Sequence, residues 1–72
     1  MSEISTQDVG PRAQQALIES PIYALRDLRV EQSGERLLLS GMVGSFYHKQ
    51  LAQEVVRTVA QGCEVVNSIR VR

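Results

Sequence analysis

Apolar residues near the N-terminus recur at the spacing of an amphipathic helix. Over residues 9–20 the apolar or small positions follow one another every three or four residues, with charged and amide side chains between them. Pro21 ends this pattern, because the residue before a proline is disfavoured in the α-helical region. Residues 22–25 leave room for one further short turn. Residues 1–8 are polar and without pattern, and predict a flexible tail before a domain that spans residues 9–72.

A second helix is predicted over residues 46–60. Ser45 precedes it in the N-cap position, where a serine hydroxyl accepts a hydrogen bond from a free N–H group of the first turn. Gly62 is expected as the left-handed residue directly after the helix. The apolar stripe that turns this helix toward the core consists of Leu51, Ala52, Val55, Val56 and Val59.

Between and after the helices, apolar and polar residues alternate with a period of two, which predicts three β-strands. The first strand covers residues 28–31 and alternates cleanly, whereas the second, over residues 36–43, is apolar on both faces for much of its length. Gly34 lies in the stretch 32–35 between them, so we expect a β-hairpin with a loop of about four residues. The last strand covers residues 65–71. The predicted order of elements is therefore α-β-β-α-β.

This order favours an α+β fold in two layers, a sandwich with both helices on one face of a three-stranded mixed sheet. The second strand, the second helix and the last strand form a β-α-β unit, which makes those two strands parallel. The doubly apolar second strand is expected at the centre of the sheet. The alternative places the first strand in the middle and makes all neighbours antiparallel. The sheet face toward the helices is expected to carry Leu28, Val30, Leu37, Leu39, Val43, Val65, Ile69 and Val71.

Two residues inside the strands need a structural reason. Gly41 lies within the second strand, where a glycine marks a bulge or a close approach, and we expect one of the helices to pack tightly over it. Asn67 points toward the core by alternation. Since a buried amide must be hydrogen-bonded, we expect it to bond backbone groups at the turn after the second helix.

The opposite face of the sheet is left uncovered in this arrangement. It would show Leu38, Met42 and Val66 beside polar residues that include Arg70. These side chains are a candidate interaction surface, although scattered hydrophobic residues are also common on protein surfaces. A three-stranded open sheet has, in addition, two edges with which another chain can pair.

Several short segments of the chain form an ordered set. They are Ala16-Leu17, Ser20-Pro21, Leu28-x-Val30, Leu39-Ser40-Gly41-x-Val43-x-Ser45, Ala52, Gly62 and Val65-x-Asn67-x-Ile69-x-Val71. No single segment is specific, but the set over residues 13–71 resembles the pattern of BON domains. The resemblance implies the α-β-β-α-β fold and a non-enzymatic binding module. It also implies a link to phospholipid membranes and envelope maintenance, with no catalytic residues.

The chain departs from this family pattern at the turn before the last strand. Cys63 stands where family members commonly have a valine, and the interval from Gly62 to Val65 is one residue shorter than expected. We therefore expect a turn of different shape, or a second helix that ends at another residue.

Composition narrows the possible functions. Eight basic and eight acidic residues give a formal net charge of zero, which together with the lack of a strand aromatic pair argues against a nucleic-acid partner. The single cysteine, Cys63, excludes an intramolecular disulfide. His48 and Cys63 are expected at opposite ends of a helix roughly 22 Å long, so they cannot form a catalytic pair or a metal site. We expect no enzymatic activity, no cofactor and no metal.

The sequence thus predicts a binding module and leaves its partner open. One partner is a phospholipid membrane surface, for which Tyr47 near a domain edge and Arg12 on an amphipathic helix are candidate contacts. Another is a protein, and a third is a second copy of the chain joined through the open sheet. No signal peptide or membrane-spanning run is present. The chain as given is therefore expected in the cytoplasm, or in the periplasm or envelope if it belongs to a longer protein.

Overall fold

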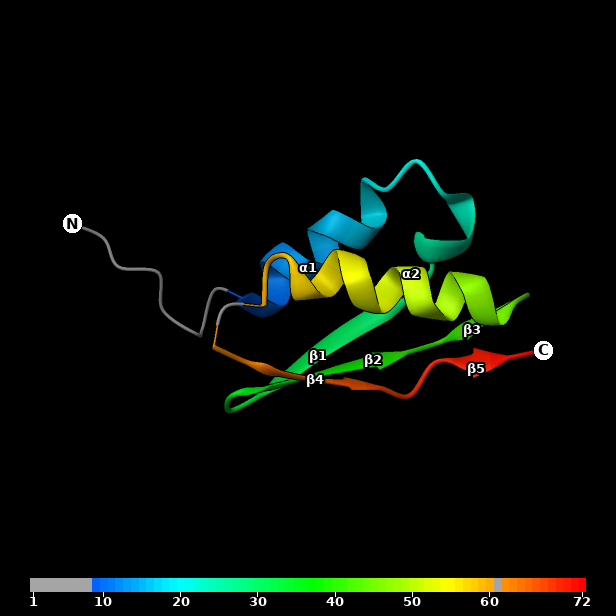
Figure 1. Cartoon of the computed structure of the whole chain (residues 1–72). Helices are drawn as coiled ribbons and strands as arrows, with labels where there is room; N and C mark the ends of the chain where they lie inside the picture. Colours follow the sequence, from blue (N-terminus) through cyan, green and yellow to red (C-terminus); the bar gives the residue numbers. More distant parts are fainter. Residues whose placement is uncertain (1–8, 61) are drawn as a thin grey trace.

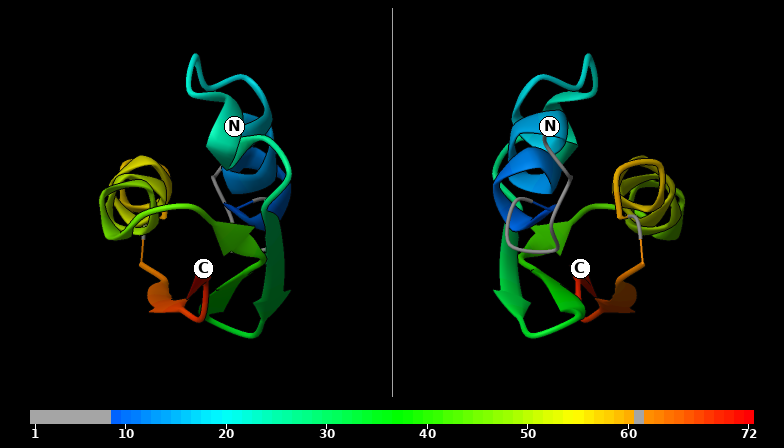
Figure 2. Two further views of the ribbon diagram at one scale, coloured as in Figure 1. Left: turned by 90° about the vertical axis from the view of Figure 1, so that its right-hand side faces the viewer. Right: turned by 90° about the vertical axis from the view of Figure 1, so that its left-hand side faces the viewer.

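Two helices lie side by side on one face of a β-sheet. The computed structural model describes residues 9–60 and 62–72, and the expected tail over residues 1–8 lies outside the described residues. The helices α1 (Val9–Ile18) and α2 (Phe46–Arg57) run in opposite directions over the sheet (Figure 1, Figure 2). The predicted two-layer α+β fold and its order of elements are confirmed.

The main sheet has three strands in the order β1-β2-β4, namely β1 (Arg29–Ser33), β2 (Arg36–Ser40) and β4 (Glu64–Asn67). β1 pairs with β2 antiparallel, and β2 pairs with β4 parallel. Of the two strand orders considered, the one with the doubly apolar strand at the centre is confirmed. Leu37 and Leu39 of β2 are fully buried, which explains why this strand takes the central position.

The second and the last predicted strands are each interrupted once. β3 (Met42–Val43) continues the path of β2, and β5 (Arg70–Val71) continues that of β4 as a short parallel pair. The two paths stay connected across the interruption, because the N–H of Arg70 donates to the carbonyl oxygen of Gly41 at 2.9 Å.

Gly41 marks this interruption, and the reason is the approach of Leu28. A Cβ atom at Gly41 would lie 2.7 Å from Cδ2 and 3.4 Å from Cα of Leu28. The backbone of Gly41 also has a φ of 128°, which L-residues rarely adopt. The expected close approach is therefore present, but the expectation of a helix over Gly41 was wrong. The packing residue belongs to the segment before β1, and the glycine lets it enter the core.

The β-hairpin is tighter than expected. Its loop has two residues, Gly34 and Glu35, and not about four, because both strands continue to the turn. Gly34, the first loop residue, has a φ of 61°, whereas Glu35, the second, does not have a positive φ. This combination is typical of a type II′ turn. Gln32, assigned to the loop from sequence, lies in β1, and its Oε1 accepts a hydrogen bond from the N–H of Gly10 at 2.8 Å.

α2 begins as predicted and ends early. The hydroxyl of Ser45 accepts a hydrogen bond from the N–H of His48 at 3.2 Å, which confirms the N-cap. The helix ends at Arg57 instead of residue 60, so Gly62 is not the residue that follows it. Gly62 does take a positive φ, 77°, in the turn that leads into β4. Of the two expectations for this turn, the earlier helix end is thus confirmed.

The core lies between the helices and the sheet. The short 3-10 helix η2 (Tyr23–Leu25) adds Leu25 to it. Val71, expected in the core, is 39% exposed because β5 lies at the end of the sheet. The buried hydrophobic residues among those described are Val9, Ala13, Leu17, Leu25, Leu28, Leu37, Leu39, Val43, Ala52, Val56 and Ile69.

The contact between Gly41 and Leu28 predicts the effect of a single methyl group. We expect Gly41→Ala to lower the free energy of unfolding by about 1–3 kcal/mol, since it adds a steric clash to a strained φ. Gly44→Ala is the matched control, because nothing lies within 4 Å of its Cβ position and its φ is ordinary. Urea denaturation of both variants measures the difference, and equal stabilities would contradict the explanation given for Gly41.

Candidate functional site

The uncovered face of the sheet does not carry one continuous apolar patch. Leu38 and Val66 are direct neighbours across β2 and β4, and both are half-buried. Met42 lies beyond the exposed Ser40 and pairs in register with Arg70. The structure thus brings Leu38 and Val66 together and separates Met42 from them.

The large hydrophobic residues that are most exposed gather at one end of the molecule. This end is formed by the C-terminus of α1, by η2, by the first turn of α2 and by β3 and β5, and it faces the viewer in Figure 2, left. We call it the aromatic end. Its exposed hydrophobic residues are Ile18, Tyr23, Met42, Phe46, Tyr47 and Val71.

Basic side chains stand directly over two of these aromatic rings. The guanidinium carbon of Arg26 lies 4.4 Å from the centroid of the Tyr23 ring. The ammonium nitrogen of Lys49 lies 5.8 Å from the centroid of the Phe46 ring. Both distances fit a cation–π interaction, which holds a positive charge next to an exposed aromatic surface.

The charged residues are unevenly distributed between the two ends. In the described part of the chain the ion pairs are Arg36 with Glu64 and Arg57 with Glu54, both away from the aromatic end. The basic residues of the aromatic end form no ion pair with any described residue; they are Arg26, Lys49, Arg70 and Arg72. The acidic residues described at this end are Glu19 and Asp27. Among the described residues, this end therefore carries an excess of positive charge, although the formal net charge of the whole chain is zero.

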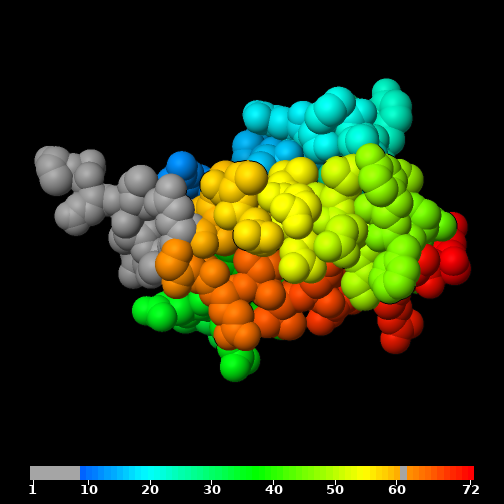
Figure 3. Space-filling view, viewed as in Figure 1, coloured from blue at the N-terminus to red at the C-terminus, as the bar shows by residue number. Residues whose placement is uncertain are grey.

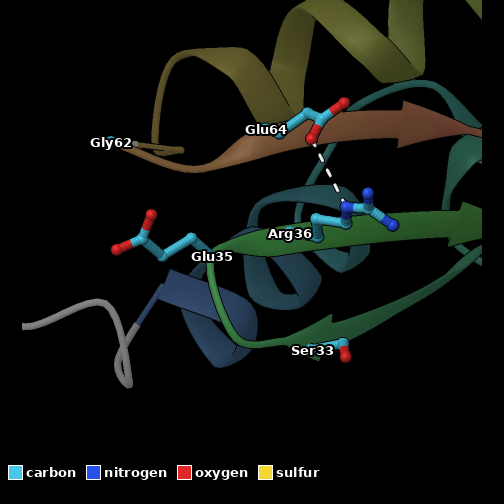
Figure 4. A pocket seen from close by; sticks show the side chains of 5 residues that line it. All are labelled: Ser33, Glu35, Arg36, Gly62 and Glu64. Atoms are coloured by element: carbon cyan, nitrogen blue, oxygen red, sulfur yellow. Dashed lines mark ion pairs between the residues drawn. The ribbon is translucent and has the colours of Figure 1, made fainter.

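The opposite end holds an open hollow lined by Ser33, Glu35, Arg36, Gly62 and Glu64 (Figure 4). Nε of Arg36 lies 3.4 Å from Oε1 of Glu64, and both side chains are more than 60% exposed. The side chain of Glu35 points away from this pair (Figure 4). The hollow is thus a solvated ion pair with a second carboxylate beside it, without the buried polar groups of a ligand pocket.

Asn67 fixes the start of α2 to the sheet. Its Nδ2 donates to the carbonyl oxygen of Lys49 and to Oε1 of Gln53, both at 3.1 Å. Its Oδ1 accepts from the N–H of Ile69 at 3.1 Å. The expected hydrogen bonding is present, but the helix partners are Lys49 and Gln53 within α2 and not groups in the turn after it. The amide therefore joins the aromatic residues of α2 to the strand path that leads to β5.

The edge of β1 is closed by a residue that the sequence did not mark. Gln14 of α1 donates from Nε2 to the carbonyl oxygen of Leu28 at 2.9 Å and accepts from the N–H of Val30 at 2.8 Å. The side-chain amide thus bonds strand groups as a neighbouring strand would. Sequence periodicity assigned Gln14 to the polar side of the helix, and no local signal distinguishes it from an exposed glutamine.

The candidate membrane contacts from the sequence lie apart from each other. Arg12 lies near the start of α1 and Tyr47 in the first turn of α2, and the helices are antiparallel, so the two residues are at opposite ends of the helical layer. Tyr47 belongs to the aromatic end. Tyr23 and Lys49, which sequence reasoning did not single out, join it there. The sequence did hold one signal for Tyr23, because it is an aromatic residue in the short connection between Pro21 and the next strand.

The residues with catalytic or metal-binding potential do not form a cluster. Within residues 9–60 and 62–72, no group of three His, Cys, Asp or Glu side chains could hold a metal ion. Cys63 follows the C-terminal end of α2, and His48 lies in its first turn. Nδ1 of His48 is buried without a hydrogen-bond partner among the described residues. None of the described helices has the length and hydrophobicity needed to cross a bilayer.

The fold is that of a small α+β domain with two helices on one face of the sheet and an uncovered opposite face. The sequence model of the BON domain family matches residues 8–72, which is nearly the whole chain. The chain therefore belongs to the BON domain family, as its ordered segments predicted. BON domains are generally non-catalytic and are regarded as phospholipid-binding modules. No curated protein matches the chain.

The three hydrogen bonds of Asn67 predict a large cost for losing its amide. We expect Asn67→Ala to destabilise the domain by about 2–3 kcal/mol, because the N–H of Ile69 loses its partner and α2 loses two hydrogen bonds to the strand path. Ser68→Ala is the control, since its side chain is exposed and should change stability by less than about 0.5 kcal/mol. Thermal unfolding followed by circular dichroism measures both, and equal melting temperatures would show that these bonds contribute nothing.

Proposed function

We propose that this BON domain is a non-enzymatic module that binds the surface of anionic phospholipid membranes with its aromatic end. One observation carries the proposal: at one end of the domain, exposed aromatic residues lie among basic residues that have no ion pair and that outnumber the acidic residues described there. The membership in a family regarded as phospholipid-binding supports it.

The chemistry of a membrane surface matches both components of this end. Aromatic side chains are enriched at the level of the lipid headgroups, because one part of the ring system is apolar while its edge tolerates water. Basic side chains near an anionic surface gain about 1 kcal/mol each. Tyr23, Phe46 and Tyr47 are 78%, 72% and 65% exposed, so burial of these rings at an interface would remove apolar area from water.

The aromatic end is presented on ordered backbone and not on a long loop. Phe46 and Tyr47 occupy the first two positions of α2, where Ser45 caps the helix. Asn67 holds the next turn to the sheet through Lys49. Because these residues are fixed before binding, little conformational entropy is lost when they contact lipid.

Flotation with liposomes tests the proposal. We expect the domain to float with vesicles that contain phosphatidylglycerol and to float poorly with pure phosphatidylcholine. Lys49→Glu should weaken binding to the anionic vesicles about tenfold or more, since it reverses a charge at the surface. The double variant Phe46→Ser/Tyr47→Ser should also lose most of its binding, because it removes the aromatic contact.

Arg57→Glu is the matched control. It makes the same change of charge on the same helix, but at the end that we expect to face away from the membrane. Circular dichroism must show that all variants remain folded. Equal loss of binding in Lys49→Glu and Arg57→Glu would contradict a specific binding end, and equal flotation with both kinds of vesicle would contradict the selectivity for anionic lipid.

A further inference from the structure

The two edges of the sheet differ in how far they are already paired. At the edge of β1, Gln14 bonds the carbonyl group of Leu28 and the N–H of Val30, and the side chain of Gln32 ties the strand to Gly10. At the edge of β4, no strand of the described residues pairs with the outer side. Figure 3 shows β4 in orange lying open below α2 on this side of the molecule. β4 is therefore the edge available to another chain.

The hydrogen-bonding groups of this edge have a defined direction. The N–H groups of Glu64 and Ser68 donate to carbonyl oxygens of the β2 side, at 2.7 and 2.9 Å. Because backbone groups alternate along a strand, the N–H and C=O of Val65 and Asn67 point away from β2. Asn67 is held in place by its own side-chain bonds, so this edge is ordered.

We infer that β4 pairs antiparallel with β4 of a second copy of this chain. The two-fold axis then passes beside Val66. Val65 of each copy lies opposite Asn67 of the other, so the outward N–H and C=O groups of these residues bond one another. The sheets of the two copies then form one sheet of six strands. Such an interface is isologous and closes on itself, as dimer interfaces do.

The side chains on the uncovered face are complementary in this arrangement. Val66 of one copy would lie beside Val66 of the other, and each Val66 already neighbours a half-buried Leu38 in its own sheet. The pairing therefore extends two separate apolar pairs into one row across the joined sheet. Cross-strand contacts of this kind stabilise sheets and explain why these two residues are apolar on a face without helices.

Opposite charges at the two ends of the edge favour a second copy over an unrelated strand. Glu64 and Arg70 lie on the same face as Val66 by alternation, before and after it. In the antiparallel pair, Arg70 of each copy lies diagonally across from Glu64 of the other, within reach of long side chains. Glu64 already contacts Arg36, but that pair is exposed and weak, so it leaves the carboxylate accessible.

The interface is small, so the association is expected to be weak. Edge pairing of short strands buries less area than the roughly 1,200 Å² of a stable complex. We therefore test it by sedimentation velocity up to about 1 mM, where a micromolar to submillimolar Kd is detected. The mass should rise with concentration from 8.0 kDa toward twice that value. A mass that stays at 8.0 kDa over the whole range would overturn the inference.

Exchanging the charges of Glu64 and Arg70 tests whether β4 forms the dimer interface. Arg70→Glu and Glu64→Arg should each raise the dimer Kd by about tenfold or more, because each places like charges across both symmetric contacts. The double variant Glu64→Arg/Arg70→Glu should return to within about threefold of the original Kd. Glu31→Arg is the control on the same face at the other edge, and its Kd should be unchanged. A dimer that tolerates both single variants, or that the double variant does not restore, would overturn the β4 interface.

A backbone variant gives an independent test. Val65→Pro removes an outward N–H that no residue of the same sheet accepts, so it should abolish the dimer, with circular dichroism as the check on folding. These experiments contain no lipid, and Lys49→Glu should dimerise normally. Failure of the dimer is thus distinguishable from failure of membrane binding.

Discussion

The side-chain amide of Asn67 is the connection on which the aromatic end depends. The chain enters α2 from β3 through Gly44 and Ser45 and leaves it by a turn at the far end, so the chain path gives the first turn of α2 no direct contact with β4. Asn67 supplies that contact through the carbonyl oxygen of Lys49 and through Gln53. Its oxygen also directs the strand path toward β5 through Ile69. The aromatic residues at the start of α2 and the arginines after β4 are thereby held on one ordered end.

The two ends of the domain are chemically different although the chain as a whole is neutral. At the far end, Glu64 and Glu54 neutralise basic neighbours, whereas at the aromatic end Arg26 and Lys49 stand over aromatic rings. A charge over an exposed ring can contact a headgroup while the ring contacts the boundary of the acyl chains. In the antiparallel pairing inferred for β4, the aromatic ends of two copies point in opposite directions. Arg70 belongs to both surfaces, whereas the aromatic rings and Lys49 lie outside the β4 pairing.

Local periodicity was sufficient for the elements and for the central strand, because β2 is apolar on both faces and the helices carry clear stripes. It was insufficient wherever a side chain bonds a distant part of the chain. Gln14 closes the β1 edge from 14 residues away, and Asn67 reaches 18 residues back to Lys49. The hairpin loop was overestimated because polar residues of a half-exposed edge strand resemble a turn. The aromatic residues come together at one end because the two helices are antiparallel. The pattern of apolar and polar residues within a single element does not predict how the helices are arranged.

The most direct test of the account follows the aromatic end itself into the lipid. The chain has no tryptophan, so Phe46→Trp introduces a single fluorescent reporter at this end, and Glu35→Trp introduces one at the far end. Upon addition of vesicles that contain phosphatidylglycerol, the emission of the Phe46→Trp variant should shift to shorter wavelength, while that of Glu35→Trp should not. No shift for either reporter, or an equal shift for both, would contradict the account.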